Sequence, residues 1–247
     1  MNKENRLVIF DSGLGGLSLV HHLKKNKPMA LHYCMDNAGF PYGTKTIDEL
    51  INLITNRINA LKRDYDTILI ACNTASMVYE LFLQPDPTVY SIIQYTIRDA
   101  ERLNLKRVGV IGSNRLIESE IYQKGLKNLG MDVLVFPASD LVEMVEQDIP
   151  ISNMIEYLQC QYKSLDTLGL DGLILGCTYF NWLQLAFKTL FSHPVVIIPS
   201  GFSLIDEWIE TKTFTNKDEQ LLFTRPDQET KRKVINFIKN NHILLDA

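Results

Sequence analysis

Two cysteines of this chain stand in similar settings, and both could carry out chemistry. Cys72 follows the apolar run at residues 68–71, and Cys177 follows the apolar run at residues 173–176. Polar side chains come directly after each: Asn73, Thr74 and Ser76 after the first, Thr178 and Tyr179 after the second. A single buried cysteine is usually explained by packing. Two that both lead into polar side chains favour a ligand site.

A pair of thiols on either side of one ligand can invert a stereocentre without a cofactor. One thiolate removes a proton from one face of the carbon atom, and the other thiol delivers a proton to the opposite face. The ordinary pKa of a thiol, about 8.5, is close enough to neutrality for a thiolate and a thiol to coexist. Asp11 ends another apolar run, at residues 7–10, and is the natural candidate to tune a thiol.

The other two cysteines, Cys34 and Cys160, lack this setting. Cys34 lies within an apolar run and Cys160 within a helical pattern, so we predict that both are packing residues. The four cysteines form no Cys-x-x-Cys motif and no cluster with metal-ligand spacing, so no structural metal site is expected.

Composition excludes several classes of protein. With 247 residues, 46% of them hydrophobic, the chain can bury a full core. Its net charge of -4, without a basic stripe, argues against a nucleic-acid partner. Apolar runs are far shorter than the roughly 20 residues that span a bilayer. The polar N-terminus does not resemble a signal peptide, so we expect a cytoplasmic protein.

Short apolar runs alternate with helical patterns, which predicts an α/β fold with parallel sheets. The expected strands cover residues 7–10, 31–35 and 67–71, and the expected helices residues 17–25, 46–63, 204–210 and 229–240. The helix at 46–63 opens with a capping box formed by Thr46 and Glu49.

The two halves of the chain also resemble each other. Residues 6–12 match residues 107–113, and residues 66–72 match residues 171–177, at offsets of 101 and 105 residues. This repeat predicts two similar lobes, each a mostly parallel sheet flanked by helices. Ligands bind beyond the carboxyl ends of parallel strands, where both cysteines stand. We therefore expect the active site in a cleft between the lobes.

Four motifs resemble those of the bacterial glutamate racemases in the aspartate/glutamate racemase superfamily. They are Asp11-Ser-Gly-Leu-Gly-Gly-Leu17, Phe40-Pro-Tyr-Gly43, Cys72-Asn-Thr-Ala-Ser76 and Leu175-Gly-Cys-Thr178. The resemblance implies an isomerase that interconverts L- and D-glutamate for peptidoglycan precursor synthesis, without pyridoxal phosphate or a metal. Cys72 and Cys177 would be the two bases.

The resemblance also implies roles for further residues. Asp11 and Glu146 would support catalysis, and the substrate would be bound by Asp11, Ser12, Tyr42, Gly43, Asn73, Thr74, Ser113, Thr178 and Tyr179. It implies a discontinuous first lobe, residues 1–95 plus 205–247, and a second lobe of residues 96–204. Homodimers are common in the family.

The chain departs from the family pattern at three places. Tyr179 replaces a histidine for which Glu146 would be the partner, and a phenol with a pKa of about 10 does not replace an imidazole near neutrality. Ser113 and Leu116 replace two threonines, and residues 199–201 read Pro-Ser-Gly where Asp-Ser-Gly is expected. Three alternatives therefore stay open: an aspartate racemase, a related isomerase or decarboxylase, and a degenerate racemase that binds an amino acid or a protein partner without turning it over.

A dinucleotide-binding oxidoreductase is the main alternative of another class. The first strand, the glycine turn and Asp36 about 20 residues later suggest a Rossmann site. However, Gly13, Gly15 and Gly16 do not complete the G-x-G-x-x-G pattern, and this reading gives neither cysteine motif a role.

Overall fold

The computed structural model describes residues 5–147 and 149–240, and the chain divides into two compact units. The first unit spans Met1–Ile92 and Gly201–Ala247, and the second spans Ile93–Ser200. The first unit is thus discontinuous in sequence. The resemblance implied junctions at residues 95–96 and 204–205.

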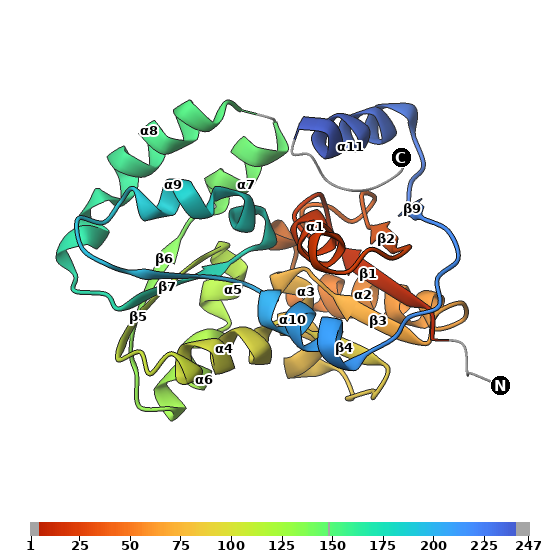
Figure 1. The fold of residues 1–247 in the computed structure, drawn as a ribbon, viewed down its shortest axis with the longest axis horizontal. Coiled ribbons are helices and arrows are strands. Elements are labelled where there is room, and N and C mark those ends of the chain that lie inside the picture. The colour runs from red at the N-terminus through yellow and green to blue at the C-terminus, as the bar shows by residue number, and fades with distance from the viewer. Residues whose placement is uncertain (1–4, 148, 241–247) are drawn as a thin grey trace. The chain divides into compact units, whose positions relative to one another are not determined.

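The first unit is built on a five-stranded parallel sheet in the order β4-β3-β1-β2-β9. Helix α1 packs against α10, and α2 packs against α3 (Figure 1). The strands are β1 (Leu7–Asp11), β2 (His32–Met35), β3 (Thr67–Ile70), β4 (Val89–Ser91) and β9 (Gln220–Phe223). The helices are α1 (Leu17–Asn26), α2 (Ile47–Leu61), α3 (Asn73–Phe82), α10 (Phe202–Thr211), α11 (Gln228–Asn240) and the short 3-10 helix η1 (Tyr42–Thr44).

The second unit is built on a four-stranded parallel sheet in the order β6-β5-β7-β8. Figure 1 shows α8 and α9 on one face of this sheet and α4 and α6 on the other. Its strands are β5 (Arg107–Gly112), β6 (Asp132–Pro137), β7 (Gly172–Gly176) and β8 (Val196–Pro199). Its helices are α4 (Ile93–Arg102), α5 (Asn114–Glu118), α6 (Ile121–Asn128), α7 (Ser139–Glu146), α8 (Ile151–Tyr162) and α9 (Gln184–Lys188), with the 3-10 helices η2 (Lys163–Thr167) and η3 (Thr178–Leu183).

The two sheets repeat the same topology. The order β4-β3-β1-β2 of the first corresponds to β8-β7-β5-β6 of the second. Equivalent aspartates make equivalent contacts, since the Asp66 carboxylate accepts from the Arg6 amide (3.1 Å) and the Asp171 carboxylate accepts from the Arg107 amide (2.8 Å). The predicted fold of two similar α/β lobes with parallel sheets is confirmed.

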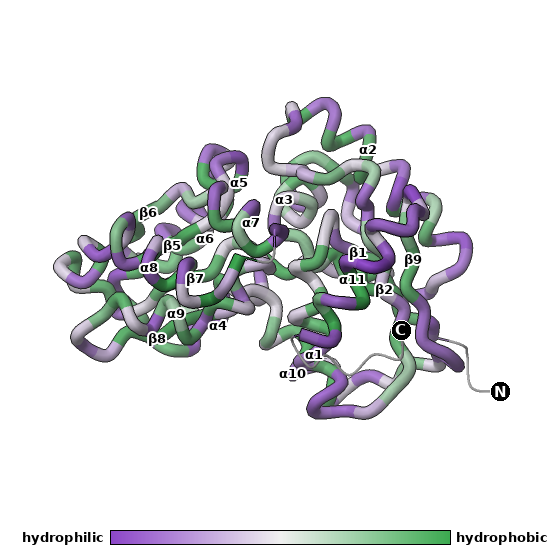
Figure 2. Tube along the Cα trace, turned by 90° about the horizontal axis from the view of Figure 1, so that it is seen from above, coloured by the Kyte–Doolittle hydropathy of each residue, from purple (hydrophilic) through white to green (hydrophobic). Residues whose placement is uncertain are grey.

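Helix α2 shows how local sequence determines these elements. The Glu49 amide donates to the Thr46 hydroxyl (3.3 Å), and the Thr46 amide donates to the Glu49 carboxylate (2.8 Å), which completes the predicted capping box. Its buried side chains, Leu50, Ile54, Ile58 and Leu61, recur every three or four residues. Hydrophobic and hydrophilic segments accordingly alternate along α2 in Figure 2.

The two cysteines predicted to pack differ in their surroundings. Cys34 is buried within β2, as predicted. Cys160 is exposed on α8, so the prediction that it packs in the core was wrong. The buried positions of α8 are Met154 and Leu158, and a residue two positions after Leu158 lies on the opposite face of a helix. Within the described part of the chain, no helix is long and apolar enough to span a membrane.

Candidate functional site

Cys72 lies at the carboxyl end of β3, where the strand gives way to α3. It is the N-cap residue of α3, and its thiol is buried. The Ser12 hydroxyl lies 3.5 Å from its sulfur atom. Burial and the neighbouring Asp11 carboxylate raise the pKa of Cys72 to about 12, although hydrogen bonding from Ser12 and from the first amides of α3 acts in the opposite direction. This thiol is therefore protonated at neutral pH.

Asp11 ends the adjacent strand β1, and the glycine turn holds its side chain in place. Its carboxylate accepts from the Gly13 amide (3.0 Å) and lies 3.3 Å from the Ser12 hydroxyl. Gly16 packs against the same side chain, because a Cβ atom at this position would lie 2.8 Å from the Asp11 Oδ2 atom. One turn thus fixes a buried carboxylate, a hydroxyl and a thiol at the carboxyl edge of the first sheet.

Tyr42 belongs to the loop that follows β2, and its hydroxyl is held by a buried acid. The side chain is buried, and its hydroxyl donates to Asp36 (2.6 Å). Burial and the Asp36 carboxylate raise the pKa of Tyr42 well above its ordinary value. Asp36 is 0% exposed and pairs with Arg57 at 3.2 Å. The acid that a Rossmann site would offer to a ribose is therefore occupied inside the protein.

Cys177 occupies the equivalent place in the second unit. It follows β7 and is the N-cap residue of η3, and it is more exposed than Cys72. Gly112 at the end of β5 pairs with Gly176 at the end of β7. Ser113 and Cys177 therefore come directly after the ends of two neighbouring strands. Leu116 covers both glycines, since a Cβ atom on either would come within 3 Å of its side chain. The leucine that replaces a family threonine thus packs over the strand ends.

Tyr179 and Glu146 contact each other directly, which the sequence alone did not explain. The Tyr179 side chain is buried in η3, and its hydroxyl donates to the carboxylate of Glu146, the last residue of α7. Glu146 therefore has a hydrogen-bonding partner at the position where the family places a histidine.

The third departure from the family pattern has a structural role. The Asn181 side chain accepts from the Ser200 amide and donates to the Ser200 carbonyl, both at 3.1 Å. Gly201 follows with a φ of 86° and precedes α10, a conformation that favours glycine. The Asn181 side chain thus holds Ser200 at the end of β8.

The residues singled out from the sequence gather at two strand edges, each within its own unit. The first edge carries Asp11, Ser12, Tyr42, Gly43, Cys72, Asn73 and Thr74, and the second carries Ser113, Glu146, Cys177, Thr178 and Tyr179. Sequence reasoning did not identify Asp36 and Arg57 as partners of Tyr42. Among the described residues, no group of three or more His, Cys, Asp or Glu side chains is placed to hold a metal ion.

Comparison with known sequences gives a consistent result. A profile of the Asp/Glu/hydantoin racemase family matches residues 18–200. The glutamate racemase of Limosilactobacillus reuteri is 33% identical over 218 residues, which cover 85% of this chain and 81% of that protein.

Solved structures share the fold over nearly the whole chain. The glutamate racemase of Campylobacter jejuni matches with a TM-score of 0.79 and 26% identity, covering 98% of this chain and all of that one. The glutamate racemase of Francisella tularensis, solved in complex with D-glutamate, matches with a TM-score of 0.81 and 22% identity, covering 96% of this chain and 94% of that one.

Proposed function

This chain belongs to the Asp/Glu/hydantoin racemase family, and we propose that it interconverts L- and D-glutamate without a cofactor, using Cys72 and Cys177 as its two bases. The observation that carries the proposal is the equivalence of the two thiols. Cys72 follows β3, which lies beside β1, and Cys177 follows β7, which lies beside β5. Each cysteine is the N-cap residue of the helix that comes next, α3 or η3.

The proposed mechanism moves one proton onto the α-carbon and one proton off it. A thiolate removes the α-proton from one face, and the thiol of the other cysteine delivers a proton to the opposite face. The roles exchange when the reaction runs in reverse. Hydrogen bonding from Ser12 and from the first amides of α3 stabilises the thiolate of Cys72 in this step.

Substrate binding follows from the same strand edges. We propose that the polar groups beside each thiol hold the two carboxylates and the ammonium group of glutamate. These groups belong to Asp11, Ser12, Tyr42, Gly43, Asn73, Thr74, Ser113, Thr178 and Tyr179. Glu146 would act through Tyr179, to which it is hydrogen bonded.

The decisive experiment follows the α-proton. The protein is incubated in D2O with L-glutamate, D-glutamate and both enantiomers of aspartate, and the loss of each α-proton signal is followed by NMR. We expect exchange with both enantiomers of glutamate. Exchange with aspartate alone would support an aspartate racemase, the alternative suggested by the replacement of the family histidine by Tyr179. No exchange by folded protein would refute the racemase.

Cysteine variants test the two-base mechanism. Cys72→Ala and Cys177→Ala should each abolish racemisation, because each removes one of the two proton-transfer groups. Cys160→Ala is the matched control, since this thiol is exposed on α8 and takes no part in either strand edge. Full activity in either of the first two variants would contradict the mechanism.

The cellular role follows from the product. We propose that the D-glutamate serves peptidoglycan precursor synthesis in the cytoplasm, and that two copies of the chain associate as a homodimer. Depletion in the source cell should then be rescued by external D-glutamate. Light scattering on the purified protein should give twice the mass of the 28.3 kDa chain.

A further inference from the structure

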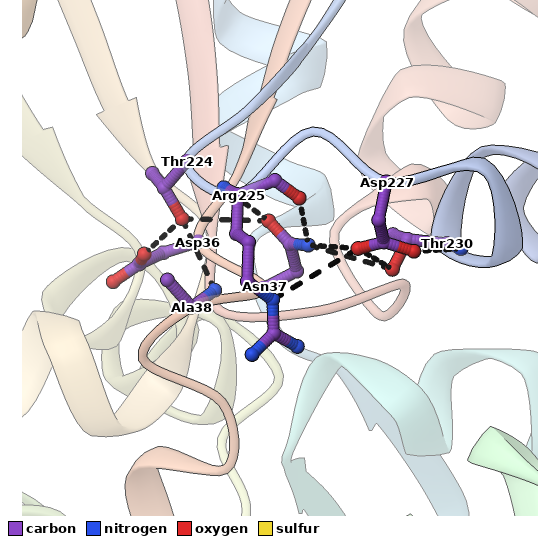
Figure 3. A network of polar contacts seen from close by, with 7 residues as sticks. All are labelled: Asp36, Asn37, Ala38, Thr224, Arg225, Asp227 and Thr230. Atoms are coloured by element: carbon purple, nitrogen blue, oxygen red, sulfur yellow. Dashed lines mark hydrogen bonds and ion pairs between the residues drawn. The ribbon is translucent and has the colours of Figure 1, made fainter.

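The segment that follows β9 lies against the loop that follows β2. These two strands pair in parallel, from His32 with Gln220 to Met35 with Phe223, so both end at the same edge of the sheet. The next residues of each strand, Asp36–Ala38 and Thr224–Thr230, form a network of polar contacts (Figure 3). This edge also carries Tyr42 and Cys72.

Asn37 holds the main chain of the C-terminal segment. Its side chain is buried, and its amide group donates to the Arg225 carbonyl (2.6 Å) and to the side chains of Asp227 (3.3 Å) and Thr230 (3.4 Å). Its carbonyl oxygen accepts from the Arg225 amide (3.0 Å). One side chain thus pairs with both main-chain groups of Arg225, as a neighbouring strand would.

Thr224 connects this network to Tyr42 through a single carboxylate. The Thr224 hydroxyl donates to Asp36 Oδ1 and accepts from the Ala38 amide (3.1 Å). The other oxygen of the same carboxylate accepts from the Tyr42 hydroxyl (2.6 Å). Asp36 is fully buried, and Arg57 compensates its charge at 3.2 Å. A change at Thr224 therefore acts on the group that orients Tyr42.

We infer that Asn37 and Thr224 are positioning residues, which hold the loop of residues 38–43 in the conformation that binds substrate. This inference rests on the proposed function, in which Tyr42 and Gly43 contact the amino acid. Neither Asn37 nor Thr224 is assigned to substrate, so each acts through the loop. Their loss should weaken substrate binding more than it slows the proton transfers at the thiols.

The kinetic test uses variants that separate positioning from general stability. Thr224→Val removes the hydroxyl but keeps the shape of the side chain, Thr224→Ser restores the hydroxyl, and Asn37→Ala removes the contacts to Arg225. We expect Thr224→Val and Asn37→Ala to raise KM for glutamate by about fivefold, equivalent to about 1 kcal/mol. We expect kcat to change by less than about twofold, and Thr224→Ser to restore KM.

Asn216 provides a matched control at the other end of the same sheet. Its side chain also pairs with both main-chain groups of one residue, accepting from the Leu7 amide (2.9 Å) and donating to the Leu7 carbonyl (2.8 Å). Leu7 begins β1, so this contact lies at the amino edge. Asn216→Ala should lower Tm as Asn37→Ala does but leave KM unchanged. An equal rise of KM in both variants would overturn the inference.

Hydrogen-deuterium exchange tests the loop without any reference to turnover. The amides of Gly39, Phe40, Tyr42 and Gly43 should exchange faster in Thr224→Val and Asn37→Ala than in the parent chain, and at the parent rate in Asn216→Ala. Unchanged exchange in the first two variants would refute the positioning role. If the variants show the expected exchange rates but the parent chain does not racemise glutamate, the proposed function is refuted and the effect of Asn37 and Thr224 on the loop is not.

Discussion

Replacement of Asp11 by asparagine should make the Cys72 thiol more acidic and faster to alkylate. The buried Asp11 carboxylate is the second cause, after burial, that raises the pKa of Cys72 to about 12. Asparagine keeps nearly the same shape and an oxygen that can accept from the Gly13 amide, but it carries no charge. The pKa of Cys72 should therefore fall toward its ordinary value.

The contacts of Ser12 set the size of this effect. Its hydroxyl lies 3.3 Å from Asp11 Oδ1 and 3.5 Å from the Cys72 sulfur, so the two charged atoms are at most about 7 Å apart. At an effective dielectric constant of about 20, unit charges at about 7 Å repel by about 2 kcal/mol. This energy corresponds to between one and two pKa units. Because a more acidic thiolate is also a weaker nucleophile, alkylation near pH 8 should accelerate by only about tenfold.

The assay measures iodoacetamide labelling of the peptide that contains Cys72 by mass spectrometry. A Cys160→Ala background removes the exposed thiol from the competition. Ser12→Ala serves as the opposite control, because it removes a hydrogen bond that lowers the pKa of Cys72, and labelling should slow. Labelling of folded Asp11→Asn at or below the parent rate would show that the Asp11 charge does not control this thiol.

Three further predictions concern other parts of the two units. Tyr179→Phe removes the hydroxyl that donates to Glu146 and should lower kcat/KM. Tyr179→His restores the family residue and should raise kcat/KM. A lower kcat/KM in the histidine variant would mean that the phenol has its own role. Burial raises the pKa of Cys34 to about 12, so its thiol ionises first in the unfolded chain. The free energy of unfolding should therefore fall by about 1 kcal/mol between about pH 8 and pH 10. Urea titrations should show a weaker pH dependence in Cys34→Ala, and an equal dependence would contradict this assignment. Gly16→Ala places a Cβ atom 2.8 Å from Asp11 Oδ2, so we expect a loss of about 1–3 kcal/mol in urea unfolding together with slower racemisation; unaltered racemisation would show that Asp11 need not stay in place.

Features that depend on neighbouring residues could be predicted from the sequence. The capping box of α2 needs only Thr46 and Glu49, three positions apart, and the structure contains both of its hydrogen bonds. The repeat around Asp66 and Asp171 was also readable, because each aspartate stands at a fixed distance before its apolar strand. Sequence patterns of this kind predict local structure, and the repeat predicts the same local structure in both lobes.

Contacts between distant parts of the chain could not be predicted in this way. Asn37 and Arg225 are 188 residues apart, and no local pattern indicates that β9 pairs with β2. Asp36 was interpreted as a possible ribose ligand, yet it is buried beside Tyr42 and Arg57. Cys160 was misplaced because a cysteine within a helical pattern carries no information about which face of the helix is buried.

The buried setting of Cys72 has a consequence for how catalysis would begin. With a pKa of about 12, Cys72 is protonated at neutral pH and can serve as a proton donor. To serve as a base it needs a nearby positive charge, since Asp11 opposes its ionisation. We propose that the ammonium group of the substrate supplies that charge by pairing with Asp11, which neutralises the carboxylate that holds the pKa of Cys72 up. Substrate binding thus lowers the pKa of Cys72 in this mechanism, so that the thiol can ionise and act as a base.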